Sequence, residues 1–344
     1  MIGETSKRLG LWAALAAVGV GAGILPVGPA RAGQADEVRK LRAENQALRK
    51  QVDNLRGQVE LLQQRLADLS ATVRQLQARA AARGSVRRPV PAEPSRKLNI
   101  RVVPGGWGNA GTADIQKVLL SAAGELWKHF PRRKLAPIVV KHGSRGPIVL
   151  HRKGDSGEYL VHLDVEGRYW CQFAYQFAHE FCHILTNYGK RDAKENLWFE
   201  ESLCEMASMY ALTAMSRSWR TSPPYPNWRS YAPAIADYAE KLRRKKPPTL
   251  PAGQTLADWL AANLPELRRD PYLRGKNRLV AMQLLPLFEA EPQRWEAVGY
   301  LNQRPTHPKG SFEGYLANWL RDVPERHKPF VRRVIKLLGA KTGG

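Results

Sequence analysis

Apolar residues recur three and four positions apart between Val38 and Leu76, which is the pattern of a coiled coil. Every d position is leucine and most a positions are β-branched, a combination that favours two parallel strands. Asn45 is the polar a residue of this run, and a single buried asparagine fixes register and dimer state. The pattern therefore predicts a parallel homodimer, held by a coiled coil over 36–83 with its seam at 38–76. The a residues are Val38, Asn45, Val52, Val59, Leu66 and Val73, and the d residues are Leu41, Leu48, Leu55, Leu62, Leu69 and Leu76.

The alternative to a dimer is one long amphipathic helix that packs against its own globular domain. At 1.5 Å per residue such a helix would be about 70 Å long, which exceeds the width of a domain of this size. A dimeric stalk fits the length better.

The N-terminal segment has the pattern of an export signal. Lys7 and Arg8 precede an apolar run over 9–25, and Ala30-Arg31-Ala32 has the A-x-A form that signal peptidases cut. The run is short and rich in alanine and glycine, so it is weak for a membrane span. We expect a signal peptide over 1–32 and an exported protein (periplasmic, cell-envelope or secreted). An uncleaved N-terminal membrane anchor is the alternative.

A proline- and arginine-rich linker is predicted over 84–97, because this stretch has three prolines and no apolar period. The globular domain then spans 98–344. Its first part shows strand signals and one amphipathic helix over 112–130, and from Tyr169 onward the pattern is helical. We predict an α+β fold: a small N-terminal mixed sheet with a helix, then a mainly helical subdomain, with the long coiled-coil helix in front. The predicted strands are 98–103, 137–141, 147–152 and 158–165.

The candidate chemistry lies in His179-Glu180-Phe181-Cys182-His183, which matches the pattern H-E-x-x-H. The pattern falls on a helix predicted over 169–187, where positions i and i+4 share one face, so both imidazoles can bind one metal ion. Glu201, on the next predicted helix, offers a third and anionic ligand. Two histidines and a carboxylate with a fourth position open to water are the ligand set of a catalytic zinc site.

The neighbouring carboxylates suggest roles for that site. Glu180 directly follows the first histidine, so we expect it to act as the general base that takes a proton from water attacking a polarised carbonyl. Glu205 lies one helical turn after Glu201. We expect it to accept the N–H of a ligand imidazole, which fixes the tautomer of that ring.

These motifs, with Trp198-x-x-Glu201 and Glu205, resemble the gluzincin metallopeptidases, a group that includes thermolysin-like enzymes, M1 aminopeptidases and the compact minigluzincins. The resemblance covers about 98–290. It implies His179, His183 and Glu201 as zinc ligands, Glu180 as base, and a strand before the metal helix, here 158–164, that pairs with an extended substrate. The chain has Glu200-Glu201-Ser202 where many members read Asn-Glu-Gly or Asp-Glu-Gly. A metzincin would need a third histidine soon after the motif, and 186–192 contains none.

The residue that stabilises the oxyanion is not fixed by these motifs. Tyr272 is preferred for its helical context before 277–288, and Tyr300, His307 and Tyr315 remain open as alternatives.

Three cysteines, at positions 171, 182 and 204, can be arranged in two ways. Cys182 and Cys204 neighbour the predicted ligands on two helices that must pack together, so a disulfide between them is conceivable in an oxidising compartment. We expect buried free thiols instead.

The formal net charge of +23 predicts attraction to anionic partners, among them a cell-envelope surface. No RRM, helix-turn-helix or zinc-finger signature is present, so we expect no specific nucleic-acid partner. Two functions remain open. The first is an exported, dimeric zinc peptidase acting on a peptide or protein substrate. The second is a cell-envelope coiled-coil scaffold or binding protein with a structural or inactive zinc site.

Overall fold

The computed structural model describes the N-terminal unit of the chain only in a few places. The chain divides into two units, 1–86 and 87–344. The predicted signal peptide lies outside the described residues, as do most of the coiled coil and much of the linker. Where the first unit is described it is helical, and the coiled-coil dimer stays a prediction. The described residues are 41, 44–48, 51–52, 94–188, 194–244, 249–303 and 310–340.

The second unit begins with a small mixed sheet, as predicted. Its strands are β1 (Ile100–Val102), β2 (Ile138–His142), β3 (Ile148–Val149) and β4 (Tyr159–Leu163). They lie in the order β1-β2-β4-β3, with β3 antiparallel to β4 and the other pairs parallel. Strand β4 is therefore an inner strand, and its two edges are taken by β2 and β3. The predicted pairing of a substrate with 158–164 is wrong for this reason, and β3 is the edge strand on that side.

The end of the predicted linker belongs structurally to the domain. Ser95 and Leu135 exchange backbone hydrogen bonds of 2.9 and 3.0 Å, and Trp127 Nε1 donates to Arg96 O at 2.7 Å. Residues 94–97 are thus held beside α2 (Thr112–Trp127), the helix predicted over 112–130. One side of α2 is buried, and this apolar stripe packs on β1 and on the central helices, because an amphipathic helix must cover that face.

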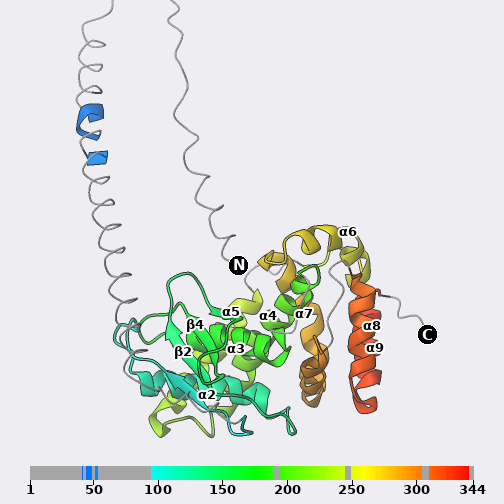
Figure 1. Ribbon diagram of the computed structural model, residues 1–344, viewed down its shortest axis with the longest axis horizontal. Helices are drawn as coiled ribbons and strands as arrows, with labels where there is room; N and C mark the ends of the chain where they lie inside the picture. Colours follow the sequence, from blue (N-terminus) through cyan, green and yellow to red (C-terminus); the bar gives the residue numbers. More distant parts are fainter. Residues whose placement is uncertain are drawn as a thin grey trace, which may run out of the picture. The chain divides into compact units, whose positions relative to one another are not determined.

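The core of the helical part is the pair α3 (Trp170–Leu185) and α4 (Leu197–Ser218). Helix α4 packs against α2, α3, α5 (Ala232–Arg244) and α7 (Arg274–Ala290), and Figure 1 shows it among these neighbours. It is buried along nearly its whole length. This explains why its sequence has little of the one-sided pattern of a surface helix. Among its polar side chains, Glu200 and Glu201 face the histidines of α3 and Glu205 pairs with Arg278 of α7.

The remaining elements close the domain. They are η2 (Pro226–Tyr231), α6 (Leu256–Arg269), η3 (Pro292–Tyr300), α8 (Phe312–Asp322), η4 (Glu325–His327) and α9 (Lys328–Leu337). Helix α6 begins with a capping box, in which Thr255 accepts from the Asp258 N–H and the Asp258 carboxylate accepts from the Thr255 N–H. Helices α8 and α9 pack side by side (Figure 1). Among the described residues, none of the helices combines the length and apolar character that crossing a bilayer requires.

Candidate metal centre

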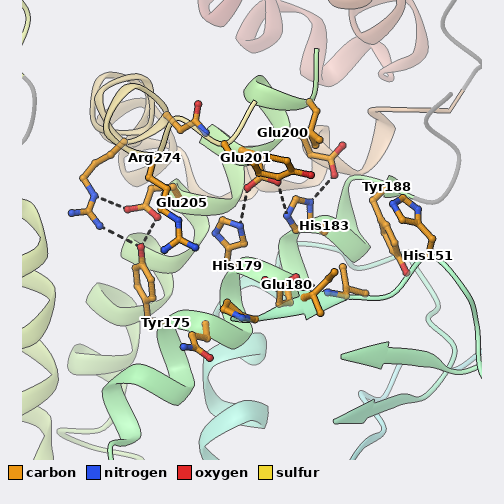
Figure 2. Close-up of a pocket in the computed structure, with 18 residues that line it drawn as sticks. His151, Tyr175, His179, Glu180, His183, Tyr188, Glu200, Glu201, Glu205 and Arg274 are labelled. Carbon is orange, nitrogen blue, oxygen red and sulfur yellow. Dashed lines mark hydrogen bonds and ion pairs between the residues drawn. The ribbon is translucent and has the colours of Figure 1, made fainter. Parts of the chain in front are cut away.

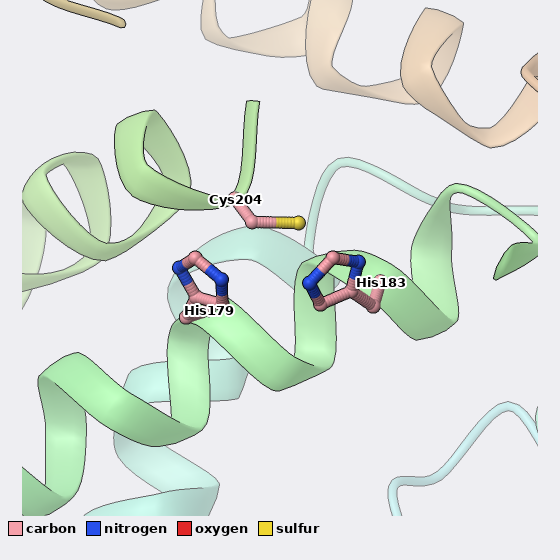
Figure 3. Close-up of side chains that lie close together, drawn as sticks. All are labelled: His179, His183 and Cys204. Atoms are coloured by element: carbon pink, nitrogen blue, oxygen red, sulfur yellow. The ribbon is translucent and has the colours of Figure 1, made fainter. Parts of the chain in front are cut away.

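Helix α3 brings the two histidines of the motif together. Their rings lie one turn apart on the same face, with centroids 5.1 Å from each other (Figure 3). Most of α3 is buried among apolar residues, which holds its backbone and orients the two imidazoles.

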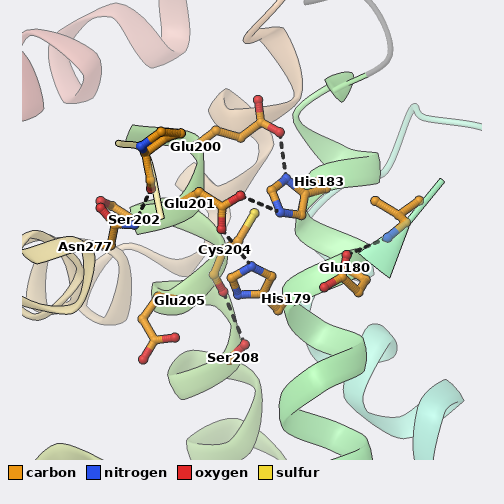
Figure 4. Close-up of polar contacts among 12 residues, drawn as sticks. His179, Glu180, His183, Glu200, Glu201, Ser202, Cys204, Glu205, Ser208 and Asn277 are labelled. Atoms are coloured by element: carbon orange, nitrogen blue, oxygen red, sulfur yellow. Dashed lines mark hydrogen bonds and ion pairs between the residues drawn. The ribbon is translucent and has the colours of Figure 1, made fainter. Parts of the chain in front are cut away.

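Glu201 on α4 completes a converging set. Its Oε2 lies 3.2 Å from His179 Nε2, and its Oε1 lies 3.5 Å from His183 Nε2 (Figure 4). A tetrahedral ion with bonds of about 2.0–2.1 Å holds its ligand atoms about 3.3–3.4 Å apart. Each histidine Nε2 lies close to this distance from one of the two Glu201 oxygens, and all three side chains line one cavity. The three residues therefore fit a zinc ion with an open side.

Cys204 is a second candidate donor. His179, His183 and Cys204 offer nitrogen and sulfur atoms that all lie within 4.8 Å of one another (Figure 3). The cysteine is fully buried, and it is not one of the described residues that line the cavity. Burial, the contact with Cys182 and the nearby Glu200 and Glu201 carboxylates raise the pKa of this thiol well above its usual value. Glu201 is therefore the better placed ligand on the open side.

Glu200 contacts the back of the second histidine. His183 Nδ1 donates to Glu200 Oε1 at 2.7 Å, which leaves Nε2 to face Glu201 (Figure 4). Burial alone would lower the pKa of His183, but the hydrogen bond to Glu200 and the Glu201, Glu200 and Glu180 carboxylates raise it to about 10. This pKa means that the surrounding carboxylates strongly favour a positive charge at the imidazole. The same carboxylates would stabilise a bound cation.

Asn302 supports Glu200 from the far side. Its side-chain Nδ2 donates to Glu200 Oε2 and to Thr186 O, each at 2.9 Å, while its Oδ1 accepts from the Tyr315 hydroxyl at 3.2 Å. The residue adopts φ 53°, a left-handed conformation that asparagine tolerates better than most side chains. This buried network orients Glu200 and, through it, His183.

Glu205 does not make the contact that the sequence suggested. Its carboxylate accepts from the Tyr175 hydroxyl and, at 2.7 Å, from Arg278 Nε (Figure 2). The hydrogen bond to His183 is made by Glu200 instead. The physical reason is that α7 packs against α4 and brings the Arg278 guanidinium to Glu205, while Glu200 turns toward α3.

Glu180 is buried at the inner wall of the cavity. Its Oε2 accepts the Val149 N–H from β3 at 2.7 Å (Figure 4). Burial raises the pKa of Glu180 above its usual value, against the opposing influence of the two histidines. A carboxylate with a raised pKa beside a metal set is suited to take up and release a proton.

The cavity itself has a volume of about 450 Å³ and lies between β3, α3, α4 and α7 (Figure 2). Among the candidate oxyanion stabilisers within the described ranges, only Tyr272 lines it. Tyr272 is 64% exposed, whereas Tyr315 is buried and donates to Asn302. His307 lies outside the described residues. Tyr188 also lines the cavity, but its hydroxyl donates to Leu150 O at 2.6 Å.

The cysteines are free thiols, as expected from the sequence, and all three are buried. Sequence reasoning missed the roles of Glu200, Asn302 and Arg278. Glu200 could have been found, because it directly precedes Glu201 on the same helix. Asn302 and Arg278 are about a hundred residues from the motif, and nothing in the local pattern connects them to it.

Comparison with known proteins gave no match, either to protein-family models, to curated proteins or to solved structures.

Proposed function

We propose that this protein is a zinc-dependent peptidase of the gluzincin type that hydrolyses peptide bonds. The observation that carries the proposal is the convergence of His179 Nε2 and His183 Nε2 on the two oxygens of Glu201, at 3.2 and 3.5 Å. The Glu180 carboxylate lines the same cavity. This combination of two imidazoles, one anionic ligand and a further carboxylate outside the ligand set supports hydrolysis rather than a purely structural site.

In this proposal each side chain has a defined task. His179, His183 and Glu201 would hold a zinc ion, which when bound would supply a Lewis acid for a carbonyl and for water. Glu180 takes the proton from the attacking water and passes it to the leaving amine, so one group serves as base and then as acid. Glu200 keeps the His183 Nδ1 proton in place throughout, because its buried carboxylate accepts that hydrogen bond.

The edge strand β3 supports the binding of an extended peptide. Its residues Ile148 and Val149 line the cavity, and Ile148 is 48% exposed. An outer strand can pair with an added strand through its outward backbone groups, here those other than the Val149 N–H, which would hold a peptide beside Glu180. The Val149 N–H already donates to Glu180, so the strand and the proposed base are mechanically linked.

The direct test compares the wild type with Glu180→Gln on a broad peptide library. We expect about one zinc per chain in both proteins and a fall in turnover of about 10²–10⁴-fold in the variant, since only the proton transfer is lost. Glu240→Gln, the same chemical change at an exposed residue of α5 that does not line the cavity, is the matched control and should leave turnover unchanged. Wild-type protein that carries zinc and cuts no peptide would contradict the proposal.

A second function is favoured by the position of Cys204. If this thiol joins the two histidines as a ligand, the protein fills more of the metal's coordination positions and leaves less room for water. Such a site suits a structural role in a scaffold protein. That alternative requires sulfur coordination, and it predicts zinc without hydrolysis. The ligand substitutions described in the Discussion distinguish the two functions.

We further propose that the protein acts outside the cytoplasm as a dimer, with its positive charge directed to an anionic envelope surface. The dimer is supported by three seam positions, Leu41, Leu48 and Val52, which are 58%, 59% and 46% exposed in the single chain. Large apolar side chains at a and d positions need a partner to be buried. Leu41→Lys/Leu48→Lys should convert the dimer to a monomer in sedimentation, whereas Ala47→Lys, off the seam, should not. A dimer that survives the double substitution would exclude this seam as the contact.

A further inference from the structure

The charged side chains that line the 450 Å³ cavity differ in whether they have a partner among the described residues. Its described lining includes four carboxylates, those of Glu180, Glu200, Glu201 and Glu205, and two guanidinium groups, those of Arg274 and Arg278. Each carboxylate has a partner of its own. Glu180 accepts from a backbone N–H, Glu200 and Glu201 face the imidazoles, and Glu205 pairs with Arg278.

Arg278 has two side-chain partners in this arrangement. Its Nε donates to Glu205 Oε1 at 2.7 Å, and its second nitrogen donates to the Tyr175 hydroxyl at 3.3 Å. Its side chain is only 19% exposed. Arg278 is thus neutralised and held in place, and it forms the inner part of the α7 wall.

Arg274 differs from Arg278 in both its exposure and its pairing. It lies one helical turn earlier on α7, it is exposed, and it forms no ion pair or hydrogen bond with another described side chain. Figure 2 shows it at the cavity on the side of Glu205 and His179. A guanidinium at the wall of a cavity that pairs with no anionic side chain of the described residues is available to bind an anion of a ligand.

We propose that Arg274 binds a carboxylate of the peptide substrate, on the side of the cavity formed by α7. This inference rests on the proposed peptidase function and narrows its substrate class to peptides with an anionic group near the cleaved bond. The planar guanidinium can grip a carboxylate with two parallel hydrogen bonds, which a neutral amide cannot match.

The position of Arg274 relative to the proposed zinc ligands suits this role. Glu205 lies one turn beyond Glu201 on α4, Arg278 contacts Glu205, and Arg274 lies one turn before Arg278 on α7. Residues one turn apart on a helix are about 5–6 Å from each other. Since an extended residue spans about 3.3 Å, the anion would belong to a residue only a few positions from the cleaved bond.

The carboxylate can come from two sources: the C-terminus of the peptide or an aspartate or glutamate side chain. Four peptides of one sequence separate them. The first pair ends in a free carboxylate or an amide, and the second pair, both amidated, carries glutamate or glutamine at one internal position. Binding is measured by calorimetry on zinc-loaded Glu180→Gln protein, which should hold the peptides without cutting them.

We expect one carboxylate form to bind about 10–100-fold more tightly than its amide counterpart. Adding Arg274→Gln should remove this difference, and the pair that responds identifies the source. Arg269→Gln is the matched control, since Arg269 is a basic residue in the last turn of α6 that does not line the cavity. It should leave the preference intact.

Equal binding of acid and amide forms in both pairs would overturn the inference, as would a preference that survives Arg274→Gln. Cleavage by the wild type keeps this outcome separate from the proposed function. Peptides cut without regard to charge would remove only the role of Arg274. If no peptide is bound or cut, the peptidase function fails as well.

Discussion

Two hollows in the same domain contain similar residue types but differ in how those residues are arranged. The first is the cavity of about 450 Å³ with the two histidines of the motif, and the second, of about 410 Å³, lies between α2, α4 and α7. The second is also lined by carboxylates, basic groups, a tyrosine and a histidine, His129. The residue types alone therefore do not distinguish the proposed metal centre from an ordinary polar cavity.

The two cavities differ in whether their side chains converge on one point. In the first hollow two imidazoles and a carboxylate point at one location, and the carboxylates raise the pKa of His183 to about 10. In the second, His129 is the one described histidine, and its Nε2 lies 2.9 Å from the Tyr210 hydroxyl. Burial, with the nearby Lys128, lowers the pKa of His129 to about 4, against a smaller opposing effect of Glu125. The first environment favours a cation and the second disfavours one.

The largest expected effect comes from removing a ligand at the first hollow. Glu201→Gln replaces the anionic donor by a neutral group of the same shape, so zinc affinity should fall by more than about 100-fold, beyond the range typical of outer contacts. Cys204→Ala should leave the affinity nearly unchanged. Competition with a chromophoric chelator measures both. The reverse ranking would make Cys204 the ligand and favour the structural site.

A smaller effect on zinc affinity is expected for a residue that contacts a proposed ligand rather than the metal itself. Glu200→Gln weakens the acceptor for the His183 Nδ1 proton, and substitutions of this kind cost about 10–100-fold in metal affinity. Glu205→Gln changes a carboxylate that faces Arg278 and Tyr175, so its effect on zinc should be much smaller. The same chelator titration applies. An equal loss in the two variants would mean that Glu205 also reaches a ligand.

The smallest effect belongs to the second hollow. The pKa of His129 is about 4 in the folded chain against an ordinary value near 6.5, so the unfolded state binds more protons between these limits. Stability from this residue is complete above about pH 6.5 and is lost as the pH falls toward 4. His129→Gln should therefore narrow the difference in urea midpoint between pH 7 and pH 4.5 and leave zinc content unchanged. A steeper acid loss in the variant would contradict this pKa.

The parts of the fold and site that could be predicted from sequence are those set by short-range periodicity. The small mixed sheet, the helix that carries His179 and His183, and the face they share all follow from local spacing. The order of the strands does not, and the sequence therefore wrongly predicts β4 as the strand that pairs with a substrate, although β3 covers its edge. Helix spacing alone cannot tell whether Glu200 or Glu205 turns toward α3, and it wrongly favours Glu205 as the partner of an imidazole.

The rest of the fold and of the candidate site depends on contacts between residues that are far apart in the sequence. Asn302 reaches Glu200 across about a hundred residues, and α7 brings Arg274 and Arg278 to a cavity whose motif lies on α3. These contacts depend on how helices pack, which a pattern along the chain does not encode. The residues of the proposed metal centre could therefore be picked out from the sequence, whereas the long-range contacts around them could not.

X-ray absorption at the zinc edge of the purified, zinc-loaded protein tests the central claim most directly, because it reports the ligand atoms themselves. We predict one zinc per chain with only nitrogen and oxygen donors at about 2.0–2.1 Å, from His179, His183, Glu201 and solvent. A sulfur donor at about 2.3 Å would show that Cys204 is a ligand and would contradict the account, as would a protein that binds no stoichiometric zinc.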